Sequence, residues 1–225
     1  MNFLIIIPAR GGSKGIQGKN IKPLNGKPLI YYSIDVARSL AKDEDICVST
    51  DDDEIIQVTE NYGLRITFKR PKELATDEAG THEVLIHAIN YYEATGRIYD
   101  AIVLLQPTSP LRTGKEVQEA INLFNKNLDM VVSVRESHAA AVISQENELG
   151  YLELTLAENS IRRQDLKEYY EYNGAVYVIN VESLKTKHLQ EFRNVKKYVM
   201  PTKHSIDIDT ELDWIIAENL LEKKI

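Results

Sequence analysis

The residues best suited to chemistry form a glycine-rich, basic loop directly after the first apolar run of the chain. The loop spans Pro8–Asn20, and its four glycines let the backbone approach a ligand and turn N–H groups toward it. Arg10, Lys14 and Lys19 add three positive charges. Backbone donors together with clustered cations are what a triphosphate requires. The alternative is a surface turn whose lysines are simply solvated.

Three named motifs compete for this loop. A Walker A loop needs Gly where Ser13 stands and Ser or Thr where Asn20 follows Lys19. No register of the glycines gives the Gly-x-Gly-x-x-Gly of dinucleotide-binding proteins. The nucleophile elbow Gly-x-Ser-x-Gly matches around Ser13, so a serine hydrolase using Ser13 remains a less favoured alternative. An elbow serine must turn straight into a helix, whereas Gly15 and Gly18 prolong the loop.

A second polar loop, Gln106–Arg112, follows an apolar run and contains two prolines that stiffen it. The Gln106 amide can both donate and accept hydrogen bonds, which suits sugar hydroxyls and amides. The alternative is a structural turn in which Arg112 forms a salt bridge.

A third candidate is the acidic segment Ser205–Asp213. Asp207 and Asp209 are two residues apart, so an extended backbone directs both carboxylates to one face. Such a pair suits a hard cation such as Mg²⁺. Alternatively, Asp209 or Thr210 is the N-cap of the last helix. The run Asp51-Asp52-Asp53 also resembles a metal-binding Asp-x-Asp motif, but the start of a helix is the favoured interpretation.

The elements that must position these loops alternate between short apolar runs and longer helical periods. This pattern predicts crossover units and a mostly parallel sheet, with ligands at the carboxyl ends of its strands. The loops after Ile7, Val48, Phe68 and Leu105 are therefore candidate site loops. Strands are predicted over 3–7, 46–50, 64–68, 101–105, 130–134 and 175–179, with one or two antiparallel strands in 139–156. Helices are predicted over 28–41, 52–62, 81–94, 113–125 and 213–221.

Composition limits the class of protein. The 225 residues are 43% hydrophobic and 27% charged, as in a soluble globular protein of one domain. A single cysteine excludes an internal disulfide framework, and a net charge of -7 argues against a general nucleic-acid binder. The apolar N-terminal run is too short for a signal peptide or a membrane span, so we expect a cytoplasmic protein without a membrane partner.

Together the motifs resemble those of the acylneuraminate cytidylyltransferases, or CMP-sialic acid synthetases, in the right order over essentially the whole chain. The matching segments are the nucleotide-binding signature at Ile7–Asn20, a second signature at Leu104–Arg112, a sugar-binding segment formed by Arg163-Gln164 with Asn173–Tyr177, and a metal-binding segment at Ser205–Asp213.

The resemblance implies an α/β fold: a Rossmann-like, mostly parallel sheet with flanking helices, of the nucleotide-diphospho-sugar transferase type. It implies a single domain over 1–225, with a small β-rich dimerisation arm inserted at about 137–170 and a homodimer. The implied reaction joins CTP to a nine-carbon acidic sugar with Mg²⁺ as cofactor and releases pyrophosphate. Which nonulosonic acid is used stays open, because Phe192 is followed by Arg193 where sialic acid members often have paired aromatics.

The resemblance also implies a role for individual residues. Arg10, Ser13, Lys14 and Lys19 would hold the triphosphate, Asn20 the ribose or base, and Arg70, Ala79 and Thr81 the cytosine. Gln106, Arg163, Gln164 and Tyr177 would bind the acid sugar, and Asp207 and Asp209 would bind Mg²⁺. Lys19, Arg10 and Asp209 are the expected catalytic residues, with Asp209 or a metal-bound hydroxyl as the base.

The alternatives are a cytidylyltransferase for the eight-carbon acid Kdo, another sugar nucleotidyltransferase, and a non-catalytic nucleotide-binding module.

Overall fold

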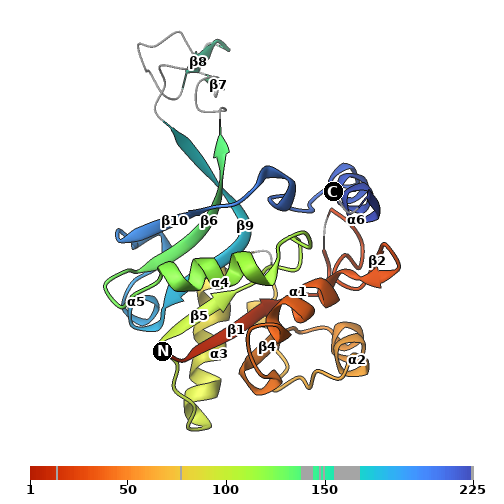
Figure 1. Ribbon diagram of the computed structural model, residues 1–225, viewed down its shortest axis with the longest axis vertical. Coiled ribbons are helices and arrows are strands. Elements are labelled where there is room, and N and C mark those ends of the chain that lie inside the picture. Colours follow the sequence, from red (N-terminus) through yellow and green to blue (C-terminus); the bar gives the residue numbers. More distant parts are fainter. Residues whose placement is uncertain are drawn as a thin grey trace.

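A six-stranded mixed sheet forms the centre of the molecule (Figure 1). The computed structural model describes residues 1–13, 15–76, 78–137, 144–146, 148, 150–154 and 168–223. The strand order is β10-β6-β9-β5-β1-β4, and all of these strands are parallel except β9, which is antiparallel to both neighbours. The bounds are β1 Phe3–Pro8, β4 Ile46–Ser49, β5 Ala101–Leu104, β6 Met130–Ser137, β9 Tyr169–Asn180 and β10 Val195–Val199. The predicted mostly parallel sheet is confirmed.

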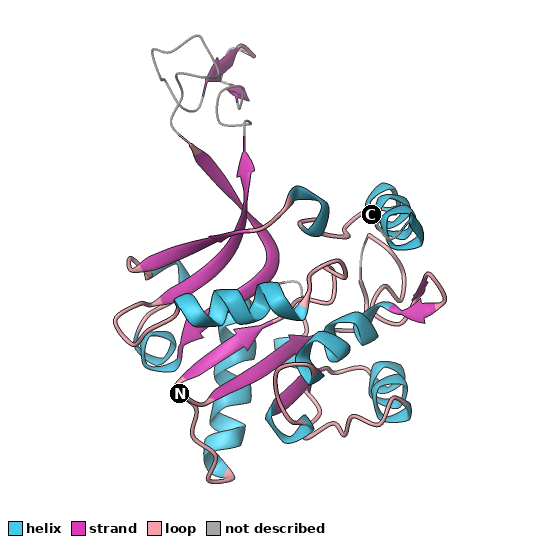
Figure 2. Cartoon of the chain, viewed as in Figure 1, coloured by secondary structure: helices cyan, strands magenta, loops and turns pink. Residues whose placement is uncertain are grey.

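Helices flank the sheet on both faces (Figure 2). They are α1 Leu29–Arg38, α2 Asp53–Asn61, α3 Thr81–Ala94, α4 Gly114–Leu123 and α5 Val181–Thr186. Helix α6, Glu211–Lys223, packs in a separate cluster. Short elements join them: the strand pair β2 Pro23–Leu24 and β3 Lys27–Pro28, and the 3-10 turns η1 Asp43–Asp45, η2 Lys72–Leu74, η5 Leu189–Glu191 and η6 Thr202–His204.

The apolar run at the N-terminus supplies both layers of the core, because successive side chains of a strand point to opposite faces. In β1, Ile5 and Ile7 pack in the cluster under α1, α2 and α4. Leu4 and Ile6 pack in the cluster under α3 and α5. A smaller cluster, which includes Trp214, fixes α6 beside the first loop. The carboxyl ends of β1, β4 and β5 therefore meet at one edge of a rigid sheet.

The predicted strand over 64–68 is wrong. This segment forms no sheet ladder. Its alternating apolar side chains are used differently, because Leu64 and Ile66 pack on one core cluster while Phe68 packs on the other. The segment thus passes alongside the edge strand β4 and leads to Arg70 at the carboxyl end of that strand. There the Arg70 backbone N–H donates to the carbonyl of Thr50 at 2.7 Å.

Strands β6 and β9 continue past the sheet as a two-stranded ribbon, which Figure 1 shows projecting from the body. Ser137 still pairs with Tyr169. Further along, β7 (Ser144–Glu146) pairs antiparallel with β8 (Leu152–Leu154), as predicted within 139–156. The predicted arm at 137–170 otherwise lies largely outside the described residues.

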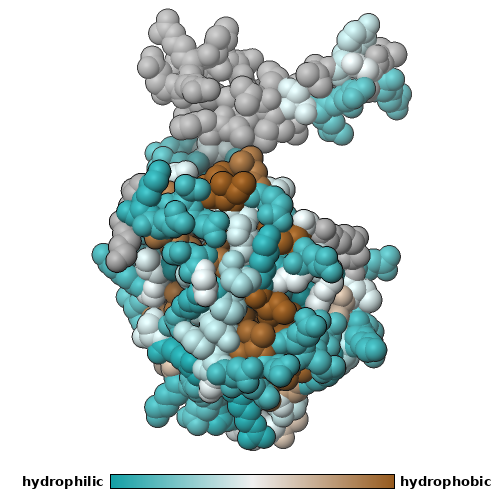
Figure 3. Space-filling model, turned by 90° about the vertical axis from the view of Figure 1, so that its right-hand side faces the viewer, coloured by the Kyte–Doolittle hydropathy of each residue, from teal (hydrophilic) through white to brown (hydrophobic). Residues whose placement is uncertain are grey.

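The face of the molecule on the side of α6 is mostly hydrophilic, with scattered apolar groups (Figure 3). On α6 the exposed large apolar side chains are Leu212, Ile215 and Ile216. Among the described helices, none is both long and apolar enough to cross a membrane.

Candidate active site

The first loop is shaped by glycines and leads into turns rather than into a helix. Gly12 and Gly18 have φ angles of +67° and +60°, which favour glycine. A Cβ on Gly15 would lie 2.2 Å from the carbonyl oxygen of Asp209, so only glycine allows this approach. The next helix begins at Leu29. Ser13 therefore lacks the strand-to-helix turn of a nucleophile elbow, which removes the geometric support for a serine hydrolase.

Lys19 joins the first loop to the acidic segment. Its ammonium donates to the carbonyl of Ile208 at 2.6 Å and to Asp209 Oδ1 at 3.2 Å. The Lys19 residue is 9% exposed, whereas the Asp209 side chain is 74% exposed. The charged end of Lys19 is thus held at the floor of the site beside a carboxylate that faces solvent.

The start of α2 and the first loop are tied together by neighbouring aspartates. Asp52 accepts hydrogen bonds from the backbone N–H groups of Glu54 and Ile55 and is the N-cap of α2. Asp51 accepts from the Gly11 backbone N–H at 3.1 Å. The favoured interpretation of Asp51-Asp52-Asp53 as a helix start is confirmed.

Arg10 and Arg70 lie on one cavity of about 260 Å³, which Ala79 and Thr81 also line. Arg10 donates to the carbonyl of Thr76 at 3.0 Å, and its own carbonyl accepts from Asn20 Nδ2 at 3.0 Å. The structure thus brings together the three residues predicted to read cytosine. The Arg70 guanidinium also binds the hydroxyl and the carbonyl of Ser49 at the end of β4, and burial lowers its pKa.

A larger cavity of about 450 Å³ joins the three predicted motifs. Among its lining residues are Arg10, Ser13, Lys19, Asn20, Gln106, Asp207 and Asp209. The loops that carry them come from the ends of β1 and β5 and from the segment before α6. The backbone N–H of Ile208 donates to the carbonyl of Thr108 at 2.8 Å, which fixes the acidic segment to the second loop.

Asp207 is the most perturbed acid of this cavity. Burial raises its pKa and the nearby Asp209 adds to the shift, although Thr108 and Lys19 oppose it. Its Oδ1 is buried and has no hydrogen-bond partner among the described residues. An unpartnered carboxylate oxygen beside a second carboxylate fits a hard cation such as Mg²⁺.

Asp209 is available for such a cation because it does not cap α6. The cap is Thr210, whose hydroxyl accepts from the Asp213 backbone N–H while the Asp213 carboxylate accepts from Thr210. The described residues hold no group of three or more His, Cys, Asp and Glu side chains that could bind a metal ion. A cation held by Asp207 and Asp209 would therefore take its other oxygen ligands from water or phosphate.

The second loop is held from within by Arg112. Its guanidinium donates to the carbonyls of Gln106 at 2.6 Å and Ser109 at 3.0 Å, and also to the hydroxyl of Ser33. Arg112 thus stabilises the loop as a structural turn, as in the alternative interpretation, but it pairs with carbonyls and a hydroxyl rather than with a carboxylate. Gln106 lies at the open side of this turn and lines a further cavity of about 390 Å³ with Tyr177. Burial raises the pKa of Tyr177, so its hydroxyl stays protonated at neutral pH.

Sequence reasoning missed a buried amide that supports the acidic segment. Asn173 Nδ2 donates to Ser205 Oγ at 2.9 Å, and its Oδ1 accepts from Ser133 Oγ at 2.6 Å. The next residue, Gly174, has φ +72°, and a Cβ there would lie 2.9 Å from Gln106 Oε1 and 3.0 Å from Asp207 Oδ2. The family motif places this Asn-Gly pair in the sugar-binding segment, and the contacts of the structure also link Gly174 to Asp207.

Three predicted site residues, Lys14, Arg163 and Gln164, lie outside the described residues.

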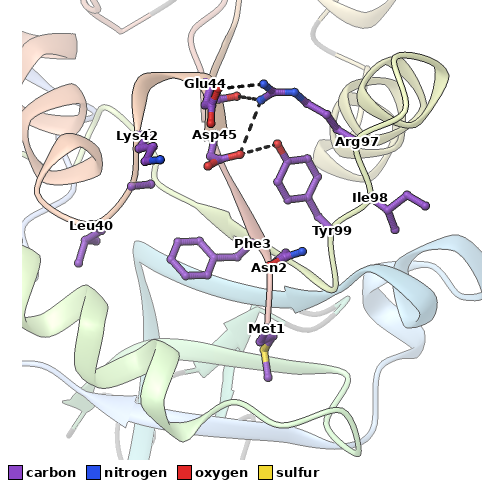
Figure 4. A pocket seen from close by; sticks show the side chains of 11 residues that line it. Met1, Asn2, Phe3, Leu40, Lys42, Glu44, Asp45, Arg97, Ile98 and Tyr99 are labelled. Carbon is purple, nitrogen blue, oxygen red and sulfur yellow. Dashed lines mark hydrogen bonds and ion pairs between the residues drawn. The ribbon is translucent and has the colours of Figure 1, made fainter.

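A separate hollow of about 560 Å³ opens at the amino ends of β1 and β5 (Figure 4). Its arginine, Arg97, already pairs with Glu44 and Asp45, and Tyr99 donates to Asp45 at 2.8 Å. No predicted site residue lines this hollow. The carboxyl edge of the sheet therefore remains the candidate site.

Comparison with known proteins gives the same assignment at the level of family. A family model described as "Cytidylyltransferase" matches residues 4–224. An N-acylneuraminate cytidylyltransferase of Escherichia coli is 35% identical over 229 residues, covering 99% of this chain and 52% of the relative. The chain thus spans about half the length of that protein. A CMP-N,N'-diacetyllegionaminic acid synthase of Legionella pneumophila is 34% identical, with 99% of this chain and 97% of the relative covered.

The fold has a clear counterpart among solved structures. A CMP:2-keto-3-deoxy-manno-octonic acid synthetase complexed with CTP superposes with a TM-score of 0.73 over 100% of both chains. Its sequence identity is 17%, so the likeness concerns the fold alone. It confirms the predicted nucleotide-diphospho-sugar transferase type of sheet and flanking helices.

Proposed function

This chain belongs to the cytidylyltransferase family, and on that premise we propose that it joins CTP to a nonulosonic acid, giving the CMP-sugar and pyrophosphate. The observation that supports this most is the pair of cavities that meet at Gln106. One carries cations and two carboxylates, as a nucleoside triphosphate and its metal require. The other contains an amide, a tyrosine and apolar side chains, which suit a sugar derivative.

In the proposed reaction the anomeric 2-hydroxyl oxygen attacks the α-phosphorus of CTP as the bond to the pyrophosphate oxygen breaks. Reactions of this type depend on positioning and charge neutralisation rather than on a covalent nucleophile. Arg10 and Lys19 neutralise the phosphates, with Lys14 as a third cation and Ser13 and Asn20 as hydrogen-bonding partners. Arg70, Ala79 and Thr81 bind the cytosine.

Asp207 and Asp209 would bind Mg²⁺, which would stabilise the negative charge that builds on the phosphate oxygens. Asp209 is the candidate to accept the proton of the sugar hydroxyl, since its side chain is exposed to the cavity. Gln106 and Tyr177 orient the sugar, and Arg163 with Gln164 binds its carboxylate. A planar guanidinium can hold both carboxylate oxygens at once.

The proposal includes a homodimer formed through the arm at 137–170 and a cytoplasmic location. The two-stranded ribbon of β6 and β9 supports the first part, because an isolated ribbon buries too little apolar surface to be stable alone. The use of CTP supports the second, since nucleoside triphosphates are available in the cytoplasm.

The test is pyrophosphate release over a matrix of CTP, UTP, ATP and GTP against nonulosonic acids and the eight-carbon acid Kdo, with Mg²⁺. We expect turnover with CTP and at least one nonulosonic acid, and at least ~10-fold lower kcat/KM for Kdo, since a missing polar contact can cost this much. Turnover with Kdo alone would favour the alternative substrate. Failure with CTP and every acid would overturn the proposal.

A further inference from the structure

The cavity beside Gln106 changes character along its length. Its floor is the face of the sheet that packs against α3 and α5. Leu104 and Tyr177 are register partners near Gln106, at the mouth. Ile179 pairs with Met130, and Met130 with Val195, so these residues form the next row, farther from Gln106. We call this second row, with Phe192 above it, the deep end of the cavity.

The deep end is apolar. Of the eleven residues that line the cavity, the four that are buried are Leu104, Met130, Ile179 and Phe192, and all four are apolar. The polar lining residues are exposed or half-buried. Gln106 also borders the cavity with the acids, and Thr81 also borders the one with Arg70, which places both at the mouth.

The direction of the sugar in this cavity follows from the reaction. The proposed chemistry requires the carboxylate and the anomeric hydroxyl to lie near Gln106, Asp207 and Asp209, where the α-phosphate would be. The opposite end of a nine-carbon acid, which carries C9, then enters the deep end. A hydroxyl placed against these apolar side chains would gain no hydrogen bond from them, whereas a methyl group would pack against them.

We propose that this site selects nonulosonic acids that end in a methyl group at C9 over acids that carry a C9 hydroxyl. The inference rests on the proposed function and names the substrate class of the same site. The selecting residues are Met130, Ile179, Phe192 and Val195.

The test compares N-acetylneuraminic acid with its 9-deoxy analogue, which differ only at C9. With saturating CTP, we expect kcat/KM for the 9-deoxy acid to be about 10- to 100-fold higher, the range by which apolar pockets reject an added hydroxyl. Equal values, or a preference for the hydroxylated acid, would overturn the inference while leaving the proposed function intact. No turnover with any nonulosonic acid would overturn both.

A pair of substitutions on β10 tests the assignment to the deep end. Val195→Thr adds a hydroxyl of nearly the same shape inside the cavity, so the preference for the 9-deoxy acid should fall several-fold. Val199→Thr, four residues along the same strand and 40% exposed, is the matched control and should leave the ratio unchanged. The KM for CTP should stay constant in both variants, which monitors folding. An unchanged ratio in Val195→Thr would contradict the assignment.

Discussion

Burial disfavours the ionised form of the Asp207 carboxyl, whereas the proposed binding of a metal cation requires that form. Its carboxylate is removed from water, stands close to Asp209 and has one oxygen without a partner among the described residues. Burying an ionised group in this way costs free energy unless a cation compensates it. The ionised carboxylate of Asp207 therefore destabilises the fold unless a cation binds beside it. Strongly perturbed acids of this kind are typical of functional sites.

Asp207→Asn should raise stability and abolish activity. The pKa of Asp207 is higher in the folded state than in the unfolded state, so protonation of this carboxyl stabilises the fold. That stabilisation is lost as the pH rises through the folded-state pKa. At pH 7 without metal, the neutral variant should therefore have a higher Tm than the wild type, and the difference should shrink toward pH 4. Its kcat should fall at least ~100-fold, because the proposed site for Mg²⁺ loses one of its two carboxylates.

Calorimetry with a chelator and pyrophosphate release measure the two effects. Added Mg²⁺ should raise the Tm of the wild type more than that of the variant. A variant that is less stable at pH 7, or that retains its kcat, would contradict the role given to Asp207.

The order of elements predicts which loops lie together but not the contacts between them. The basic loop and the loop that contains Gln106 are predicted to meet, because loops at the carboxyl ends of parallel strands share one end of the sheet, and both line the cavity of about 450 Å³. The two aspartates are placed with these loops only by the family resemblance. The contact of Lys19 with the Ile208 carbonyl could not be predicted. It joins residues 189 positions apart and depends on how α6 packs beside the first loop.

At the scale of elements, helices with an apolar stripe were predicted well. The bounds of α3 agree with the prediction, and α2 starts at the run of aspartates as expected, with Asp52 as its N-cap. The errors have physical causes. The 64–68 segment alternates like a strand because it packs on two core clusters, and β10 was missed because Lys196 and Lys197 interrupt its apolar pattern. The six-residue α5 is too short to show a helical period.

The turn at Gly174 is the element-scale feature that the site depends on most directly. A side chain at this position would contact both Gln106, which borders both cavities, and Asp207, which lines the cavity of about 450 Å³. Gly174→Ala should therefore lower kcat/KM at least ~10-fold, since a displacement of catalytic groups by about 1 Å can cost this much or more. Steady-state kinetics measures this loss.

Gly96→Ala is the matched control for the backbone strain. Gly96 also has a positive φ, of +83°, but its Cβ would meet nothing within 4 Å. Both variants should lose about 1–2 kcal/mol of unfolding free energy in urea, from the left-handed backbone alone. Only Gly174→Ala should lose activity. Equal kcat/KM in the two variants would show that the Gly174 contacts do not matter.

At the scale of the whole molecule, charge is divided between surface and site. The chain carries a net charge of -7, yet the first loop has three basic residues and no acidic one. Many acids instead pair at the surface, such as Asp43 with Arg38, where the ion pair lowers the pKa of Asp43. The cations of the first loop attract a polyanion to the site, whereas the net negative charge of the whole chain disfavours anions elsewhere on the surface.

The ribbon of β6 and β9 allows the proposed arm to be tested as a unit. Ser137 and Tyr169 are opposite each other in an antiparallel ladder, so an Asn-Gly turn can replace residues 138–168 and close a hairpin without moving the sheet. The wild type should sediment at twice the 25.6 kDa of one chain, and the shortened variant at the mass of a single shortened chain. The variant should still bind CTP, because the described residues of the nucleotide site all lie outside the deletion.

Turnover should be lost with the arm, since Arg163 and Gln164 are removed with it. Arg163→Ala in the full-length chain separates the two causes: it should remain a dimer, bind CTP normally and lose activity through a higher KM for the acid sugar. A monomeric wild type, or a shortened variant that still dimerises, would contradict the role of the arm. If the shortened variant kept full turnover, the assignment of Arg163 to the sugar carboxylate would be wrong, because no other part of the proposal supplies that contact.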